Sequence, residues 1–300
     1  MSPLRTLLLT VLALTAFAGN SLLCRLALKG NAMDPASFTA IRLMSGGLVL
    51  WAVARSRPGA PPGRGNWVSA CALFAYAACF SFAYVSLPTG TGALLLFGAV
   101  QALMIGYGLW SGERLRPLQF AGLALAFAGL AGLLLPGVSA PPLAGAALML
   151  LAGMSWGVYS LRGKGAGDPT RVSAGNFLRA APLAVALGLF MLLLGGSSLD
   201  AAGFWLALAS GALTSGIGYA VWYTVVPALK ATTAASVQLS VPVLAALGGI
   251  AFLGEPLTLR LVLASSAILG GIALVVLQKR AAPGTTPGIP QGGALKSPGD

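Results

Sequence analysis

The side chains of this sequence that could bind a ligand lie inside long apolar runs. They are carboxamides and phenols rather than charged groups, namely Asn20, Gln101, Tyr159, Tyr223 and Gln238. A carboxamide that is left unpaired in an apolar medium costs free energy. Each of these groups therefore either hydrogen-bonds across packed helices or lines a polar cavity. Their number favours a cavity.

One further set of candidates is aromatic and follows helical spacing. Tyr76, Phe80 and Tyr84 recur at every fourth position, which places them on one face of a helix. Contact with lipid or packing against another helix would explain a phenylalanine, but a tyrosine hydroxyl at this depth needs a partner or a wet cavity. Tyr84 lies near the end of its run and fits an interfacial anchor, whereas Tyr76 is deeper and indicates a cavity.

The sequence lacks the residues that intramembrane enzymes require for catalysis. The chain contains no histidine, so a zinc-binding HExxH motif and a histidine general base are absent. Paired intramembrane aspartates, as an aspartyl protease requires, are absent too. All six acidic residues stand at predicted loops or ends: Asp34, Glu113, Asp168, Asp200, Glu255 and Asp300. The sequence therefore predicts no enzyme and no cofactor, and it gives no buried carboxylate through which transport could be coupled to protons.

Composition determines which elements must hold these residues. With 57% hydrophobic and 8% charged residues, the chain cannot cover a water-soluble surface, which is ordinarily about a quarter charged. The three cysteines lie inside apolar runs, which argues against a disulfide framework or a metal site. A membrane-spanning helix needs roughly 20 apolar residues. Ten such segments are predicted, at about 4–28, 37–54, 67–86, 90–110, 117–135, 143–161, 173–194, 203–225, 231–252 and 258–277.

The loops between these segments indicate the orientation of the chain. Thirteen Lys and Arg residues fall on one side and only Lys29 and Arg260 on the other, so both termini are expected in the cytoplasm of a cell with the protein in its plasma (inner) membrane. Because the basic residues form no stripe on a folded face, the net charge of +12 does not indicate nucleic-acid binding. Residues 279–300 are rich in Pro and Gly and are expected to be a disordered cytoplasmic tail.

The sequence contains an internal repeat. Gly112-Glu113 and Gly254-Glu255 each join two apolar runs, and the alignment continues to Gly129 and Gly271. It predicts two five-helix repeats, residues 1–136 and 137–278. An odd number of spans inserts the second repeat upside down, an arrangement common in secondary transporters.

The two glutamates of these joints have two interpretations. A carboxylate in the first turn complements the dipole of the helix that follows it, and Pro117 or Pro256 could begin that helix. Alternatively, the glutamate could couple transport to protons. The first interpretation is favoured, because both joints lie at the membrane interface rather than near the midplane.

With these paired joints and Trp156-Gly157 in the sixth segment, the sequence resembles the EamA family of the drug/metabolite transporter superfamily, and within it the YddG-type exporters of aromatic amino acids. The resemblance covers about residues 4–277 and implies ten helices around a central cavity. It assigns substrate binding most directly to Trp156, Tyr76, Phe80 and Phe97. The chain departs from that pattern at Ala99, where an aromatic residue is expected, and at Val100, where a proline is expected. The ninth segment keeps its proline, Pro242.

Three arginines lie within or near apolar segments: Arg25, Arg42 and Arg179. Each is within about two turns of a membrane face, so snorkelling to the headgroups is the simpler explanation. The alternative is recognition of a substrate carboxylate, by Arg42 on the outer side or Arg179 on the inner side.

Together these features predict a secondary exporter of small metabolites, with amino acids, including aromatic ones, as the expected substrates. It would work as a monomer surrounded by membrane lipids, by alternating access and facilitated diffusion. A flippase for a lipid or lipid-linked headgroup, or an exporter of another metabolite, is the alternative.

Overall fold

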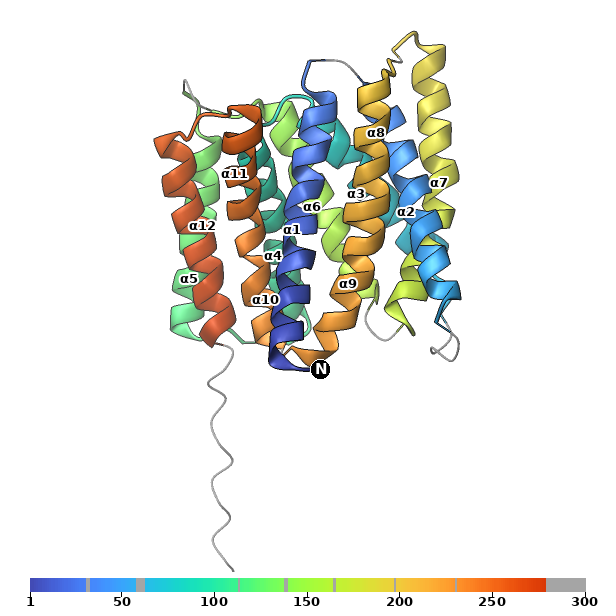
Figure 1. Cartoon of the computed structure of the whole chain (residues 1–300). Helices are drawn as coiled ribbons and strands as arrows, with labels where there is room; N and C mark the ends of the chain where they lie inside the picture. Colours follow the sequence, from blue (N-terminus) through green and yellow to red (C-terminus); the bar gives the residue numbers. More distant parts are fainter. Residues whose placement is uncertain are drawn as a thin grey trace, which may run out of the picture.

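The computed structural model describes residues 1–30, 33–57, 63–112, 114–137, 140–163, 166–196, 198–229 and 231–278, without the side chains of residues 231, 232, 235, 236 and 278. Glu113 and the predicted tail, 279–300, lie outside the described residues. Within them the chain is a bundle of helices (Figure 1), and one isolated β-bridge joins Met33 to Leu199.

The helices follow the predicted segments. The first half contains α1 (Pro3–Leu28), α2 (Pro35–Arg55), α3 (Trp67–Tyr84), α4 (Thr89–Trp110) and α5 (Pro117–Leu134). The second half begins with α6 (Leu143–Gly163) and α7 (Pro169–Leu193). A composite helix follows, made of α8 (Ala201–Ala209), the π-helix η1 (Ser210–Ile217), α9 (Gly218–Val225) and the short 3-10 helix η2 (Val226–Ala228). The last elements are α10 (Ala231–Gln238), α11 (Ser240–Leu253) and α12 (Leu259–Gln278).

In the described part of the chain, nine helices are long and apolar enough to cross a membrane, when α8 to η2 count as one. The ninth predicted segment, 231–252, is divided into α10 and α11, because Pro242 has no amide hydrogen to donate to the carbonyl of Gln238, and α10 ends at Gln238. The start of α1 and the end of α12 lie at the same end of the bundle (Figure 1). The all-α, multi-pass membrane fold is thus confirmed.

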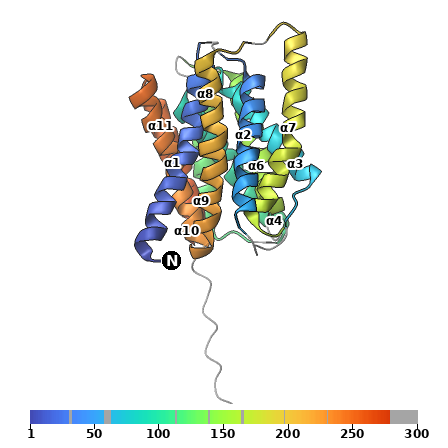
Figure 2. The same cartoon turned by 45° about the vertical axis from the view of Figure 1, so that its right-hand side comes forward.

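Helix packing repeats between the two halves. The α2 helix packs on its counterpart α7, and α5 packs on its counterpart α12. The contact of α3 with α6 is matched by that of α1 with α8, η1 and α9, and the contact of α4 with α6 is matched by that of α1 with α11. Figure 2 shows α1 beside the composite helix that contains α8 and α9. This exchange of partners is what two inverted five-helix repeats produce.

Small residues bring the repeats together at α5 and α12. Gly129 packs on Ala267, and its counterpart Gly271 packs on Ala126. A side chain at either glycine would collide with the facing helix, since close approach of membrane helices requires small residues. The two glycines that the alignment paired therefore perform the same packing role.

The acidic residues of the described chain lie at helix ends, as predicted. Asp34, Asp168 and Asp200 are the N-caps of α2, α7 and α8. Each carboxylate accepts backbone N–H bonds of the first helical turn. Pro117 begins α5, but Pro256 does not begin α12, which starts three residues later at Leu259.

Candidate substrate site

A small cavity lies at the centre of the bundle. Its volume is about 40 Å³, enough for one or two water molecules. The predicted site residues that line it are Asn20, Tyr76, Phe80, Phe97, Trp156 and Gln238. Because these residues come from both repeats, the cavity lies between the two halves of the chain. We call this space the central cavity.

Aromatic rings form most of one wall of the central cavity. The Trp156 ring lies 4.9 Å from the Tyr76 ring and 5.4 Å from the Tyr219 ring, measured between centroids. Tyr76 in turn lies 5.5 Å from Phe80. Such offset and edge-to-face arrangements favour aromatic packing. Trp156 is thus the centre of an aromatic wall, in the position that the sequence predicted.

The small residue at position 99 has a packing explanation. Ala99 is buried on α4, and a side chain at Gly153 of α6 would collide with its methyl group. The two helices therefore approach closely at this level, which leaves no room for an aromatic residue at position 99. Val100 lines the cavity instead.

Three predicted site residues do not line the central cavity. Gln101 lies on α4 outside the lining, and Tyr159 and Tyr223 share Ser173 in a hydroxyl chain, with oxygen distances of 3.1 and 3.0 Å. The hydroxyl chain joins α6, α7 and α9. The hydroxyl groups of Tyr159 and Tyr223 are therefore satisfied by hydrogen bonds between packed helices, which was the alternative to lining a polar cavity.

Sequence reasoning missed several lining residues: Phe17, Ser21, Leu96, Val100, Thr214 and Tyr219. A signal for Thr214 was present, because the segment from Ser210 to Gly218 carries small and polar residues in an otherwise apolar span. It forms the π-helix η1, a feature that often occurs at functional sites. Ser210 and Thr214 donate to Asn20 Oδ1 at 2.7 and 3.3 Å, so this carboxamide oxygen is satisfied within the protein.

Arg42 is buried beside the aromatic wall, so the expectation that it snorkels is wrong. The residue is only 1% exposed, and its Nε and Nη2 donate to Ser215 Oγ and Tyr76 Oη, at 3.2 and 2.9 Å. Its Cζ lies 5.2 Å from the Tyr76 ring centroid and 5.0 Å from that of Phe80. The reason is that Arg42 lies on the face of α2 that packs on α7, η1 and α3, whereas another face of the helix, with Leu48, is exposed.

The other two arginines lie nearer the ends of the bundle. Arg179 is half-buried and donates through Nη1 to the carbonyls of Arg64 and Gly175, at 2.6 and 2.8 Å. Arg25 donates through Nη1 to the carbonyls of Tyr84 and Val85, both at 2.8 Å. Both therefore reach polar groups near the helix ends, in contrast to Arg42.

Tyr84 is fully buried and is not an interfacial anchor. Its ring packs on Gly92, where any side chain would collide with it, and its hydroxyl donates to the carbonyl of Thr89 at 3.2 Å. Tyr76 and Phe80 are buried as well, so the aromatic face of α3 contacts protein rather than lipid.

A carboxylate closes the end of the bundle opposite the N-terminus. Glu255 accepts from the Thr89 amide at 2.8 Å and from its hydroxyl at 3.1 Å, and Arg25 Nε lies 3.5 Å from Oε1. We call Arg25, Thr89 and Glu255 the Glu255 latch. The carboxylate was expected to complement the N-terminus of the helix that follows it, α12. It complements the N-terminus of α4 instead.

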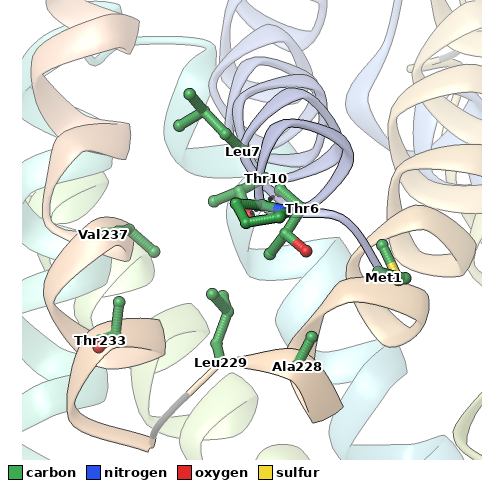
Figure 3. Close-up of a pocket in the computed structure, with 9 residues that line it drawn as sticks. Met1, Thr6, Leu7, Thr10, Ala228, Leu229, Thr233 and Val237 are labelled. Atoms are coloured by element: carbon green, nitrogen blue, oxygen red, sulfur yellow. Dashed lines mark hydrogen bonds between the residues drawn. The ribbon is translucent and has the colours of Figure 1, made fainter.

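A larger pocket, of about 460 Å³, lies at the N-terminal end of the bundle. Figure 3 shows Thr233, Leu229 and Val237 facing Thr6 and Thr10 across it. We call it the N-terminal vestibule, and it is bounded by Met1, Pro3, Thr6, Leu7, Thr10, Ala228, Leu229, Thr233 and Val237.

Apolar side chains separate the vestibule from the central cavity. Thr10 lines the first and Phe17 the second, so the two spaces are about 10 Å apart along α1. Leu14 lies between them, and the Phe17 ring packs edge-on against Trp222 and Tyr219, each at 5.8 Å. The central cavity is therefore closed toward the N-terminal end.

Comparison with known proteins finds similar sequences and one similar fold. The sequence model of the EamA-like transporter family matches the chain twice, at residues 4–135 and 143–277. The uncharacterized protein PA1977 of Pseudomonas aeruginosa is 61% identical over 274 residues, 91% of this chain and 94% of that protein. Threonine/homoserine exporters RhtA of Salmonella typhimurium and Escherichia coli K12 are 33% and 32% identical over 199 residues, 63% of each chain. A solved crystal structure aligns with a TM-score of 0.63 at 22% identity, over 94% of this chain and 100% of that one.

Proposed function

The chain belongs to the EamA-like transporter family, and we propose that it exports small metabolites, namely amino acids including aromatic ones, from the cytoplasm by alternating access. The observation that carries this proposal is the central cavity, which both repeats line with aromatic rings and carboxamides. Substrate sites of inverted-repeat transporters lie near the midplane, between the repeats. Residues 1–136 and 137–278 would be the two halves that move against each other.

The packing of α1 supports a conformation that is closed on the outer side. It contacts α3 and α4, where it forms the Glu255 latch. Its counterpart α6 makes no comparably close backbone packing with the composite helix or α11 in the described residues. With both termini in the cytoplasm of an inner-membrane protein, the N-terminal vestibule is the cytoplasmic approach to the cavity.

The residues that line the central cavity and the names of the RhtA relatives support different side chains for the substrate. Trp156, Tyr76 and Tyr219 offer apolar faces against which an aromatic ring could pack, as in YddG-type exporters. The RhtA relatives are named for threonine and homoserine, which are small and hydroxylated. Asn20, Thr214 and Gln238 offer polar groups for such side chains. We therefore propose a site that takes both aromatic and small aliphatic amino acids.

Counterflow in proteoliposomes tests this function. Vesicles with purified protein, loaded with unlabelled tryptophan, phenylalanine, threonine or alanine, receive the same labelled amino acid outside. We expect accumulation of label above that in protein-free vesicles, because exchange through one site carries label inward while the internal pool leaves. If folded protein exchanges none of the four, the amino-acid assignment is wrong, and scrambling of a fluorescent phospholipid in the same vesicles would then favour the flippase alternative.

A further inference from the structure

Among the described residues, no carboxylate neutralises the charge of Arg42, and one of its N–H groups has no hydrogen-bond partner. Arginine remains protonated in proteins, and no carboxylate of the described residues lies within the 4.0 Å of an ion pair with Arg42. Its Nη1 is buried and has no hydrogen-bond partner. An unpaired donor on a buried cation is costly. The position is therefore suited to an anion that arrives with a ligand.

Arg42 differs in this respect from the other buried basic groups. The Nε atoms of Arg25 and Arg171 are also buried without a hydrogen-bond partner. Arg25, however, forms an ion pair with Glu255, and Arg171 is in the first turn of α7, where it donates to the carbonyl of Arg57. Of the three, Arg42 alone packs on aromatic rings that line the central cavity.

The contacts of Arg42 connect it directly to the cavity wall. Its guanidinium lies over the rings of Tyr76 and Phe80, which both line the cavity. Neither ring carries a negative charge that would neutralise the guanidinium. Ser215, which holds Nε, is the neighbour of the lining residue Thr214. The guanidinium thus lies against two of the rings that line the cavity.

The present cavity is too small for a substrate, so its wall must rearrange. A space of about 40 Å³ holds water but no amino acid. The hydroxyl oxygen of Tyr76 accepts the hydrogen bond that Arg42 Nη2 donates. If Tyr76 swings away as the cavity enlarges, Nη2 is released beside the unpartnered Nη1. Two adjacent N–H donors of one guanidinium match the two oxygens of a carboxylate.

We propose that Arg42 binds the carboxylate of the transported substrate through Nη1 and Nη2, with Tyr76 as the side chain that covers it when the site is empty. The inference rests on the proposed function and narrows its substrate class to carboxylates. Amines and amides with the same side chain would be poor substrates, because they leave the buried guanidinium unpaired.

Competition by matched ligands tests this inference in the wild-type protein. Counterflow of labelled tryptophan is measured against unlabelled L-tryptophan, L-tryptophanamide and tryptamine, and counterflow of labelled threonine against L-threonine and L-threoninamide. We expect the amides and the amine to compete about ten-fold or more weakly than the acids. Equal competition by acid and amide overturns the inference while the exporter assignment stands. If no amino acid is exchanged at all, the proposed function fails, and the inference fails with it.

Variants separate recognition from support of the fold. Arg42→Gln should reduce the preference for acid over amide to nearly one, and Arg42→Lys should retain part of it. Arg179→Gln, the equivalent position of the other repeat, should keep the wild-type preference. A folded Arg42→Gln protein with unchanged preference contradicts the inference. If that variant does not fold, the wild-type competition decides alone.

Discussion

At the residue scale, the Glu255 latch shows how one carboxylate can hold a membrane bundle closed. It accepts hydrogen bonds from both the amide and the hydroxyl of Thr89 and lies beside Arg25, so it joins α1, α4 and the α11–α12 loop. Gly249 leaves room for it, since a side chain there would collide with both Glu255 and Thr89. A carboxylate at a helix N-terminus is stabilising, and a partly buried one more so.

Neutralising this carboxylate should open the end of the bundle that it closes. We expect Glu255→Gln to remove about 1–2 kcal/mol of the stabilisation of the closed conformation, because the negative charge no longer interacts with the N-terminus of α4 and with Arg25. The population of the open conformation should then rise about ten-fold. The reporter is Ser21→Cys, a cavity position, in a protein whose native cysteines are replaced by alanine. Its reaction with a membrane-impermeant maleimide is followed from the outer side.

Asp200→Asn provides the matched control for this prediction. It removes a carboxylate from the same end, but one that caps its own helix by accepting from Gly203 N. Its labelling rate should stay near that of the parent. Equal rates in the two variants would mean that Glu255 does not control access to the cavity.

At the element scale, the π-helix η1 is where the composite helix meets both α1 and α2. It presents Ser210 and Thr214 to Asn20, and Ser215 to Arg42. Gly211 allows this approach, because a side chain there would collide with Ser45 and the backbone of Arg42. One element therefore fixes two polar groups at the central cavity.

Gly211→Ala should destabilise the protein by about 1–3 kcal/mol, since the added methyl group forces η1 and α2 apart. The comparison is Gly188→Ala on α7, where an added side chain meets nothing within 4 Å and the higher helix propensity of alanine should be neutral or slightly stabilising. Thermal unfolding in detergent measures both. A Gly211→Ala protein as stable as the Gly188→Ala protein would show that the close approach is not needed.

At the scale of the whole molecule, the sequence was sufficient for features that depend on periodicity. The spans, the repeat and the aromatic face at Tyr76 and Phe80 follow from the length and spacing of apolar and aromatic residues. The break at Pro242 alters the ninth span without removing it.

Features that depend on which helix faces which could not be obtained in this way. The burial of Arg42 and Tyr84 requires that the faces of α2 and α3 that carry them pack on other helices. The partner of Glu255 belongs to the other repeat and is 166 residues away in the chain. The sequence around Arg42 and Tyr84 fits either a side chain that reaches the membrane interface or one that is buried between helices. Only the packing of the helices distinguishes these two positions.

Transport should not require a proton gradient. In the described chain the carboxylates of Asp34, Asp168 and Asp200 cap helix ends, and that of Glu255 lies in the latch. None of the four lines the central cavity. Counterflow of labelled threonine should therefore be unchanged when a protonophore collapses the gradient. Strict dependence on the gradient would contradict facilitated diffusion and would require a titrating group at the substrate site.

The central claim is that substrates occupy the central cavity against Trp156. The most direct test compares counterflow of labelled tryptophan and threonine by the intact protein, by Trp156→Ala and by Trp110→Ala. Trp110 is 87% exposed at the end of α4 and serves as the control. The account predicts that folded Trp156→Ala loses at least about ten-fold in exchange rate, as expected for the loss of a buried aromatic contact, while Trp110→Ala keeps the rate of the intact protein. Unchanged exchange by Trp156→Ala would place the substrate elsewhere and contradict the account.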